Sequence, residues 1–290
     1  MATVQRVYRN LVRGRFCRDD LVINLSGGML GDLSGFAAAT YMRGMRWVQV
    51  PTTVLSQVDA SVGGKVGVNL PAGKNLVGSF YQPWMVMADT DTLMTLPGRT
   101  FRAGLAEVVK MAVAFDGEFF RFLCVNARAI LARRPRVLAE MVKQSVTLKA
   151  KVVAMDEREG GYRMTLNYGH TLAHALEKTA GYRSLNHGEA VSLGMCAAAQ
   201  LARELGKIKE DVVGRQRDLL EAFGLPVSLS PAQRERLRFE PVMEALVVDK
   251  KQRHGGLRLV LPSKIGSVDI LNGVPDKIVR RVFRRFLERG

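Results

Sequence analysis

The stretch LVINLSGGMLGDLSGFAAATYMRGMRWVQVP (residues 21–51) decides the fold class of this chain. Residues 21–25 form a short apolar run that ends in a glycine-rich turn, and a helix is expected over about residues 32–42. Residues 47–51 and 84–89 are two further candidates for buried strands. Apolar strands separated by helices and loops are typical of a parallel sheet. We therefore expect an α/β fold that begins with a parallel sheet.

The character of the sequence changes near Pro97, and helical periodicity dominates the chain beyond it. Strand-like runs at residues 257–262 and 267–271 have the spacing of a hairpin, and residues 276–290 carry apolar residues at helical intervals. The predicted plan is an α/β domain over residues 1–97, followed by a mainly α-helical domain over residues 98–290.

The composition bounds the class of protein. At 290 residues the chain can form one large or two modest domains, and no apolar run approaches the roughly 20 residues that span a bilayer. Its three cysteines, Cys17, Cys124 and Cys196, are widely spaced and favour reduced core residues over a disulfide framework. We expect a cytoplasmic protein whose arginine-rich start is a first helix, although that start faintly resembles an organelle presequence.

The net charge of +16 raises the possibility of a nucleic-acid partner. The densest basic segment is residues 276–290, where arginines flank one apolar stripe, a pattern typical of a helix docked on a core. The sequence contains no zinc-finger spacing and no aromatic pattern of an RNA-binding sheet. An anionic small-molecule substrate explains the charge as readily, so we expect neither a nucleic-acid nor a membrane partner.

Three of the four histidines, His170, His174 and His187, fall within eighteen residues. His170 and His174 are four apart and project from the same face of a helix, and His187 stands near the start of the next helix. Two histidines and a carboxylate from elsewhere would suit a catalytic zinc, which takes three protein ligands. The alternative is a set of helix-surface histidines, because HTLAH lacks the glutamate of the metalloprotease motif.

Two glycine-containing segments predict contact with a phosphorylated ligand. SGGMLGD (residues 26–32) lies between a strand and a helix, where free N–H groups favour phosphate, although a tight turn without a ligand needs the same glycines. Residues 51–75 are expected to form a long structureless loop rich in hydroxyls and lysines. Such a loop suits a polyhydroxylated, phosphorylated ligand, and the alternative is a merely solvated loop.

Residues 102–113 are predicted to be a helix on which Glu107 and Lys110 are three apart. One interpretation is a surface ion pair, worth about 0.2–0.5 kcal/mol. Apolar residues flank both positions, however, which favours a pair that faces a cleft. A buried carboxylate needs a partner, and a metal ion would be a strong one.

Five blocks together resemble the 3-dehydroquinate synthases, the NAD- and metal-dependent sugar-phosphate cyclases of the shikimate route. They occur in the family's order, cover almost all of the chain and are GDLSGFAAATYMRG, QVPTTVLSQVDASVGGKVGVNLPAGKN, AGLAEVVK, DEREGGYRMTLNYGHT and NHGEAVSLGM. The resemblance implies a carbon–oxygen lyase in which NAD oxidises a substrate hydroxyl, phosphate is eliminated, the ketone is reduced again and an aldol step closes the carbocycle. The implied substrate is 3-deoxy-D-arabino-heptulosonate 7-phosphate, whose carboxylate and phosphate suit arginine and lysine.

The resemblance also implies the site residues. The implied ligands of a zinc or cobalt ion are Glu107, His170 and His187. The implied NAD contacts are Gly27, Gly28, Met29, Leu30, Gly31, Asp32, Thr52, Thr53, Leu55, Asp59, Lys65, Lys74, Thr92, Leu93, Met94 and Thr95. The implied substrate contacts are Lys110, Lys149, Arg163, Asn167, His174, Asn75 and Lys250, with Lys251 as an alternative to Lys250. Arg43 is implied to reach the site of a neighbouring subunit in a homodimer.

Members of the family carry an additional N-terminal portion with the first strands of the NAD-binding domain. This chain enters partway through that domain, so the resemblance implies a partial, Rossmann-like parallel sheet with an exposed edge. Two other functions remain open: a related cyclase acting on a different sugar phosphate in secondary metabolism, and an inactive, truncated homologue that acts as a binding partner. Arg163 and Asn167 favour a carboxylate-bearing substrate.

Overall fold

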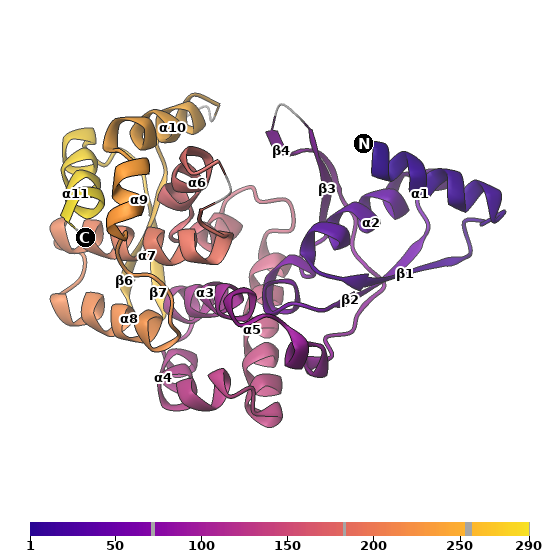
Figure 1. The fold of residues 1–290 in the computed structure, drawn as a ribbon, viewed down its shortest axis with the longest axis horizontal. Helices are drawn as coiled ribbons and strands as arrows, with labels where there is room; N and C mark the ends of the chain where they lie inside the picture. Colours follow the sequence, from indigo (N-terminus) through magenta and orange to yellow (C-terminus); the bar gives the residue numbers. More distant parts are fainter. Residues whose placement is uncertain (71–72, 182–183, 253–256, 290) are drawn as a thin grey trace. The chain divides into compact units, whose positions relative to one another are not determined.

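The computed structural model of this chain describes residues 1–70, 73–181, 184–252 and 257–289. The chain folds as two compact units. The first unit consists of residues 1–101 and 138–158, and the second of residues 102–137 and 159–290 (Figure 1). Each unit is described by itself below.

A parallel sheet forms the first unit, as predicted. Strand β1 (Leu21–Ser26) leads through helix α2 (Gly28–Thr40) to β2 (Arg46–Pro51), and β2 also pairs with β5 (Met85–Val86). All pairings are parallel, in the order β1-β2-β5. Strand β5 contains only two residues, so it is much shorter than the strand expected over residues 84–89. Helix α2 begins four residues earlier than expected, because the extended backbone of Gly27 caps its N-terminus directly after the strand.

The expectation of a structureless loop over residues 51–75 is wrong. The segment contains a single π-helical turn, η2 (Ser56–Ala60), then strand β3 (Lys65–Leu70), which pairs antiparallel with β4 (Gly73–Phe80). Gly67 and Gly78 stand opposite each other in this hairpin, and a Cβ on either would overlap the backbone of the other strand. These glycines led to the expectation of a loop, but in the structure they allow the two strands to approach each other closely.

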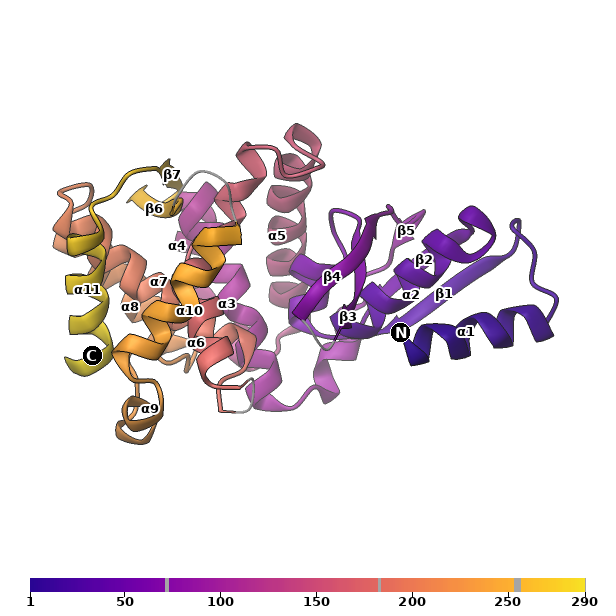
Figure 2. The same cartoon turned by 90° about the horizontal axis from the view of Figure 1, so that it is seen from above.

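Helix α2 is the centre of the first unit's core. It packs against β1 and β2 on the sheet and against β3 of the hairpin (Figures 1 and 2). Phe36 of α2, Trp47 of β2 and Val66 of β3 are buried there together, and Val4 of the first helix, α1 (Ala2–Arg13), joins them. The arginine-rich start is thus a domain helix, as expected.

Strand β1 has an uncovered apolar face within the described residues. Leu21, Ile23 and Leu25 alternate along it and are 45%, 64% and 67% exposed. Since β1 stands at the edge of its sheet, the exposed edge expected from the sequence is present.

The second unit is mainly helical. Its most buried element is α7 (His187–Glu204), which contacts α6 (His170–Thr179) and α8 (Glu210–Ala222). The expected hairpin at residues 257–271 is confirmed as an antiparallel pair. Of the remaining elements, η3 (Thr90–Thr95) and most of α5 (Pro135–Met155) belong to the first unit. Those that belong wholly or mostly to the second unit are α3 (Gly98–Phe115), α4 (Gly117–Leu131), η4 (Tyr162–Asn167), α9 (Pro231–Arg236), α10 (Phe239–Gln252), β6 (Leu259–Lys264), β7 (Ser267–Leu271) and α11 (Asp276–Arg289).

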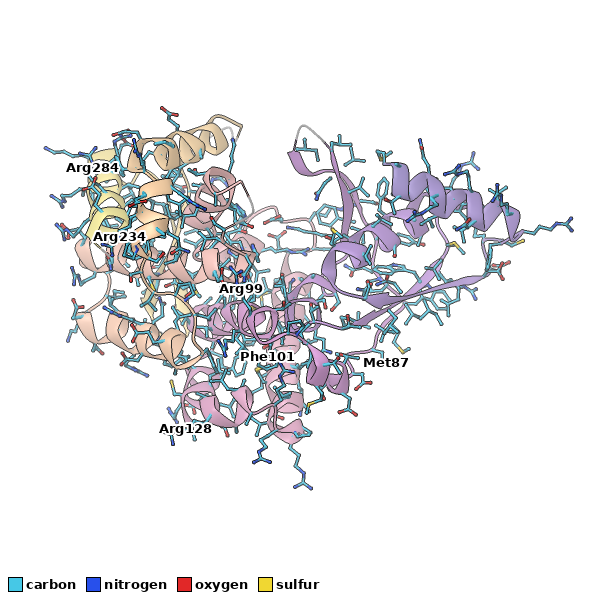
Figure 3. All side chains as sticks on the ribbon, viewed as in Figure 1. Met87, Arg99, Phe101, Arg128, Arg234 and Arg284 are labelled. Atoms are coloured by element: carbon cyan, nitrogen blue, oxygen red, sulfur yellow. The ribbon has the colours of Figure 1, made fainter. Side chains whose placement is uncertain are left out.

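The basic C-terminal helix α11 docks on the second unit through its apolar stripe, as predicted, with Phe283 and Phe286 buried. Its arginines form ion pairs: Arg284 contacts Glu240 and Arg281 contacts Glu204. Arg284 lies on the outside of this unit, as does Arg128 of α4 (Figure 3). Part of the local positive charge is therefore balanced by glutamates from neighbouring helices.

The cysteines only partly follow the prediction. All three are free thiols, but Cys17 and Cys124 are exposed and only Cys196 is buried in the core. The interpretation of all three as core residues is therefore wrong for the first two, since neither site is closed over by neighbouring elements. Within the ranges that the structure describes, none of the helices combines the length and the apolar character that crossing a membrane requires.

Candidate metal centre

Three helices of the second unit each place one side chain at a common point. Glu107 comes from the middle of α3, His170 is the first residue of α6, and His187 is the first residue of α7. Asn186 caps α7: its side chain accepts from the backbone N–H of Glu189, while the Glu189 carboxylate accepts from the N–H of Asn186. This capping box fixes the direction in which His187 leaves the preceding turn.

Two glycines of α7 allow the three helices to meet. A Cβ on Gly188 would overlap the backbone carbonyl of Ala103 in α3, and a Cβ on Gly194 would overlap that of Gly169, the residue before α6. Both contacts are closer than any side chain permits. The glycines of NHGEAVSLGM thus let α7 approach α3 and the start of α6, which brings the two histidines to Glu107.

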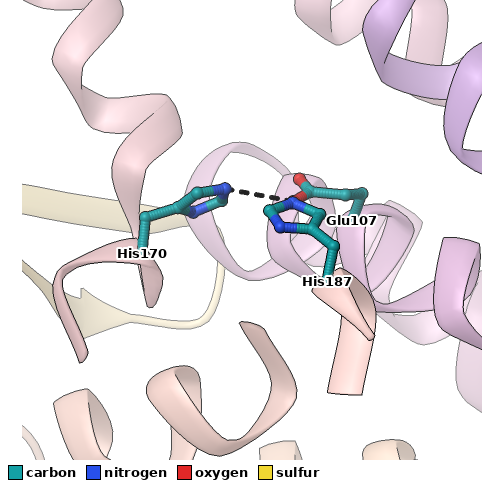
Figure 4. A group of neighbouring side chains, drawn as sticks. All are labelled: Glu107, His170 and His187. Atoms are coloured by element: carbon teal, nitrogen blue, oxygen red, sulfur yellow. Dashed lines mark hydrogen bonds and ion pairs between the residues drawn. The ribbon is translucent and has the colours of Figure 1, made fainter. Parts of the chain in front are cut away.

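The three side chains form a compact set of potential metal ligands (Figure 4). Nε2 of His170 and Nε2 of His187 each lie 3.2 Å from Oε1 of Glu107, and one ligand atom from each residue lies within 4.8 Å of the others. In a tetrahedral site with bonds of about 2.0–2.2 Å, neighbouring ligand atoms are about 3.4 Å apart. The donor set and its spacing therefore fit a zinc-like ion with a free fourth position.

The second ring nitrogens of both histidines have partners. Nδ1 of His170 lies 3.1 Å from the backbone carbonyl of Tyr168, so it donates its hydrogen there. The electron pair on Nε2 of the same ring is then free to bind a metal. Tyr168 is fully buried, and its hydroxyl donates to Oε1 of Gln216 at 2.6 Å. Nδ1 of His187 lies 3.5 Å from Oε2 of Glu177 in α6.

The electrostatics of the site favour a charged carboxylate. Burial alone would raise the pKa of Glu107, but Lys110 and the two imidazoles outweigh it and hold that pKa well below its usual range. Burial lowers the pKa of His187, yet its contacts with Glu107 and Glu177 raise it to about 10. Two carboxylates around one imidazole thus create a place that attracts positive charge.

Glu107 and Lys110 are not a surface ion pair. Nζ of Lys110 lies 2.5 Å from Oε2 of Glu107, and the two residues are 2% and 0% exposed. The interpretation as a surface ion pair is therefore wrong, and the expectation that the pair faces a cleft stays a prediction. A buried pair is expensive to break, since removing one partner leaves an uncompensated charge.

The structure also places other predicted substrate residues of the second unit near the start of α6. The ring of His174 packs edge-on against that of His170, with centroids 5.4 Å apart, so the two share a helix face as predicted. Arg163 and Asn167 lie on η4, where Arg163 is 2% exposed and Nδ2 of Asn167 donates to Oε1 of Glu159 at 3.3 Å. Lys250 and its alternative Lys251 are on α10, and their side chains lie outside the described part.

The predicted cofactor residues of the first unit gather around the N-terminus of α2 and the turn η2. Gly27 caps α2, and the run from Gly28 to Asp32 forms its first turns, where free N–H groups suit a phosphate. Desolvation raises the pKa of Asp32 to about 7, helped by nearby Asp59 and opposed by Lys149. Nζ of Lys149 lies 2.8 Å from Oδ1 of Asp59.

The segment after β2 is held to η3 by a residue that the sequence analysis did not single out. Nε2 of buried Gln57 lies 2.7 Å from the carbonyl of Asp89, 3.1 Å from Oγ1 of Thr92 and 3.1 Å from the carbonyl of Pro51. Thr53 hydrogen-bonds to Ser56 within the turn. Gln57 directly follows Ser56 in a segment that also carries Asp59, and that position is the signal that could have found it.

The remaining predicted residues are located as follows. Leu93 is fully buried, so its side chain serves the core, and Arg43 is exposed with a positive φ of 64°. Lys74 and Asn75 lie on β4, and their side chains fall outside the described residues. The other predicted cofactor positions lie on α2 (Met29, Leu30 and Gly31), between β2 and η2 (Thr52 and Leu55), at the start of β3 (Lys65) and on η3 (Met94 and Thr95).

Comparison with known sequences covers most of the chain. The sequence model described as "3-dehydroquinate synthase N-terminal" matches residues 1–103, and "3-dehydroquinate synthase C-terminal" matches residues 104–252. The 3-dehydroquinate synthase of Geobacter metallireducens is 50% identical over 270 residues, covering 93% of this chain and 74% of the relative. That of Nostoc punctiforme is 45% identical over 284 residues, covering 97% and 77%.

Solved structures show the same fold. A 2-epi-5-epi-valiolone synthase from Streptomyces hygroscopicus, with NAD+ and Zn2+ bound, has a TM-score of 0.89 at 29% identity and covers 100% of this chain and 80% of its own. A 2-deoxy-scyllo-inosose synthase complexed with carbaglucose-6-phosphate, NAD+ and Co2+ has a TM-score of 0.84 at 27% identity and covers 98% and 79%.

Proposed function

The chain belongs to the 3-dehydroquinate synthase family, and from this premise we propose that it converts 3-deoxy-D-arabino-heptulosonate 7-phosphate to 3-dehydroquinate and phosphate. This is the phosphate-eliminating cyclisation of the shikimate route to aromatic amino acids. The observation that carries the proposal is the set of Glu107, His170 and His187, whose ligand atoms converge from three helices. Three protein ligands with an open position are typical of a catalytic site.

The metal would be held by Glu107, His170 and His187, a donor set that suits zinc or cobalt. When bound, the ion would supply Lewis-acid polarisation of the reacting hydroxyl and ketone oxygens. The buried Lys110 keeps the Glu107 carboxylate charged and fixes one of its oxygens, so that the other faces the histidines. This arrangement prepares the site for a cation before substrate arrives.

NAD would bind in the first unit, where it supplies the hydride acceptor. The N-terminus of α2, from Gly27 to Asp32, offers backbone N–H groups to the pyrophosphate. The other proposed contacts include Asp59 of η2, Lys65 of β3 and the run from Thr92 to Thr95 within η3. Lys74 completes the proposed set by its position in the sequence.

The substrate's two anionic groups would be met by cationic side chains. Arg163 suits the carboxylate through its planar guanidinium, and Lys110, Lys149 and Lys250 are proposed for the remaining negative charge. His174 packs on the ring of His170 and is our candidate for moving a proton near the metal. Asn75 and Asn167 would hydrogen-bond the substrate hydroxyls.

The wider assignment follows from family membership. We propose a homodimer in which the exposed Arg43 reaches the neighbouring subunit's site, and we propose that the enzyme works in the cytoplasm. The division into an NAD-binding domain over residues 1–97 and a metal- and substrate-binding domain over residues 98–290 belongs to the same proposal.

A substrate panel tests the function. Phosphate release would be measured with NAD+ and Zn2+ from the heptulosonate phosphate, and in parallel from sedoheptulose 7-phosphate and glucose 6-phosphate, which lack the carboxylate. We expect release from the heptulosonate phosphate alone, abolished by His170→Ala. Release from a sugar phosphate without a carboxylate, and none from the heptulosonate, would contradict the proposed substrate.

A further inference from the structure

Helix α6 contributes two side chains to the candidate metal centre. His170 begins the helix, and Glu177 follows seven residues later, two turns along the same face. Oε2 of Glu177 lies 3.5 Å from Nδ1 of His187, the first residue of the next helix. One helix thus supplies a candidate ligand and also contacts the ring of another ligand, on the side away from Glu107.

The two histidines differ in what holds their second nitrogen. A histidine that binds a metal through Nε2 normally donates its Nδ1–H to an acceptor, which fixes the tautomer and the ring orientation. For His170 that acceptor is the backbone carbonyl of Tyr168. For His187 it is the side-chain carboxylate of Glu177. A substitution can therefore remove the acceptor of His187 while it leaves that of His170 in place.

Burial and helix position both disfavour a charged carboxylate at Glu177. It is 6% exposed, and a buried carboxylate is costly unless it is paired. It also lies in the last turn of α6, which ends at Thr179, where a negative charge opposes the helix dipole. The position therefore disfavours a charged carboxylate on both counts, and the contact with His187 is one interaction that offsets this cost.

We propose that Glu177 is a positioning residue for the metal: it accepts the Nδ1–H of His187 and so directs the Nε2 electron pair of that ring toward Glu107 and the ion. The inference rests on the proposed metal site and adds a residue to it. Carboxylate partners of metal-binding histidines typically contribute about 10–100-fold to metal affinity. We expect the effect of Glu177 to fall in that range.

The test compares two isosteric substitutions, Glu177→Gln and Glu189→Gln. Glu189 lies two residues after His187 and accepts from the backbone N–H of Asn186 in the capping box, which glutamine also does. The control thus removes one nearby negative charge without touching the Glu177–His187 contact. Zinc affinity would be measured by competition with a chelator, the absorption spectrum of the Co2+ form would be recorded, and the melting temperature of the metal-free chain would be compared.

We expect Glu177→Gln to weaken zinc binding about 10–100-fold and to alter the Co2+ spectrum, and we expect Glu189→Gln to stay within about twofold of wild type. Equal zinc affinity in wild type and Glu177→Gln would overturn the inference and leave the metal site standing. A drop in melting temperature without a change in zinc affinity or Co2+ spectrum would also overturn it, because the residue would then serve only the fold. Failure of wild type itself to bind zinc would contradict the metal site, and the inference with it.

Discussion

Nε2 of His187 lies 3.2 Å from Oε1 of Glu107, although the two residues are 80 positions apart in the chain. This proximity depends on Gly188, whose missing side chain lets the first turn of α7 lie on the backbone of Ala103 in α3. The candidate metal centre is therefore built by helix packing at a glycine. Its geometry follows from the contact between backbones, which side-chain patterns alone do not show.

Gly188→Ala should separate His187 from Glu107. The added Cβ would overlap the carbonyl of Ala103, so α7 must shift, at a cost of about 1–3 kcal/mol in the free energy of unfolding. Zinc affinity should fall as well. The matched control is Gly214→Ala in α8, where a Cβ meets no neighbour within 4 Å and should stabilise the chain by up to about 1 kcal/mol. Unchanged zinc affinity in Gly188→Ala would contradict the role of this contact.

Lys110→Met should destabilise the metal-free chain more than the metal-bound chain. Without its ammonium group, Glu107 keeps a buried charge, and breaking such a pair typically costs about 3–5 kcal/mol. A bound divalent ion would compensate for that charge, so saturating zinc should restore much of the loss in urea denaturation. Lys143→Met, at an exposed position, should change stability by less than about 0.5 kcal/mol. An equal loss with and without zinc would argue against an ion beside Glu107.

Asp32→Asn should change the pH dependence of stability. The carboxyl group has a usual pKa of 3.8, and burial raises the pKa to about 7 in the folded chain. Between these values the folded chain binds more protons than the unfolded chain, so stability from this group decreases as pH rises. Asparagine cannot ionise, so the variant should gain stability relative to wild type from pH 4 to pH 8. The measurement is the urea midpoint of wild type and of Asp32→Asn at pH 4 and at pH 8. If the two proteins differ by the same amount at both pH values, the prediction is wrong.

Gln57→Leu should weaken NAD binding while zinc binding stays the same. The amide group of Gln57 lies within hydrogen-bond distance of the carbonyls of Pro51 and Asp89 and the hydroxyl of Thr92, so its loss removes these hydrogen bonds, each worth about 0.5–1.5 kcal/mol net. The proposed NAD segment Thr92–Thr95 would then lose its anchor to η2. Fluorescence titration with NADH and chelator competition with zinc measure the two affinities. A variant that binds NADH as tightly as wild type would show that this anchor is dispensable.

Hydrophobic pattern was enough to predict the main elements that carry the site. The apolar runs of β1 and β2 and the helical spacing around Glu107 and His170 were each identified correctly, because burial imposes those periods. The hairpin of β3 and β4 was missed, because Gly67 and Gly78 weaken the strand pattern while permitting the close approach of the two backbones. Local composition could not distinguish that approach from a flexible loop.

The composition of the candidate centre could also be predicted, but its arrangement could not. Histidines four apart on one helix pointed to a shared face, and Glu107 was singled out by its apolar neighbours. Glu177 stands seven residues after His170, on the same helix face, yet a lone glutamate on a helix is ordinarily a solvated residue. Its role depends on where α7 begins relative to α6, which is a property of tertiary packing.

The most direct test of the account is phosphate release as a function of metal content. The chain would be stripped with a chelator, supplied with NAD+ and the heptulosonate phosphate, and titrated with Zn2+. We predict that release rises until one equivalent of zinc per chain is present, and that His187→Ala abolishes it. Release that is undiminished in the stripped chain, or undiminished in His187→Ala, would contradict a metal centre formed by Glu107, His170 and His187.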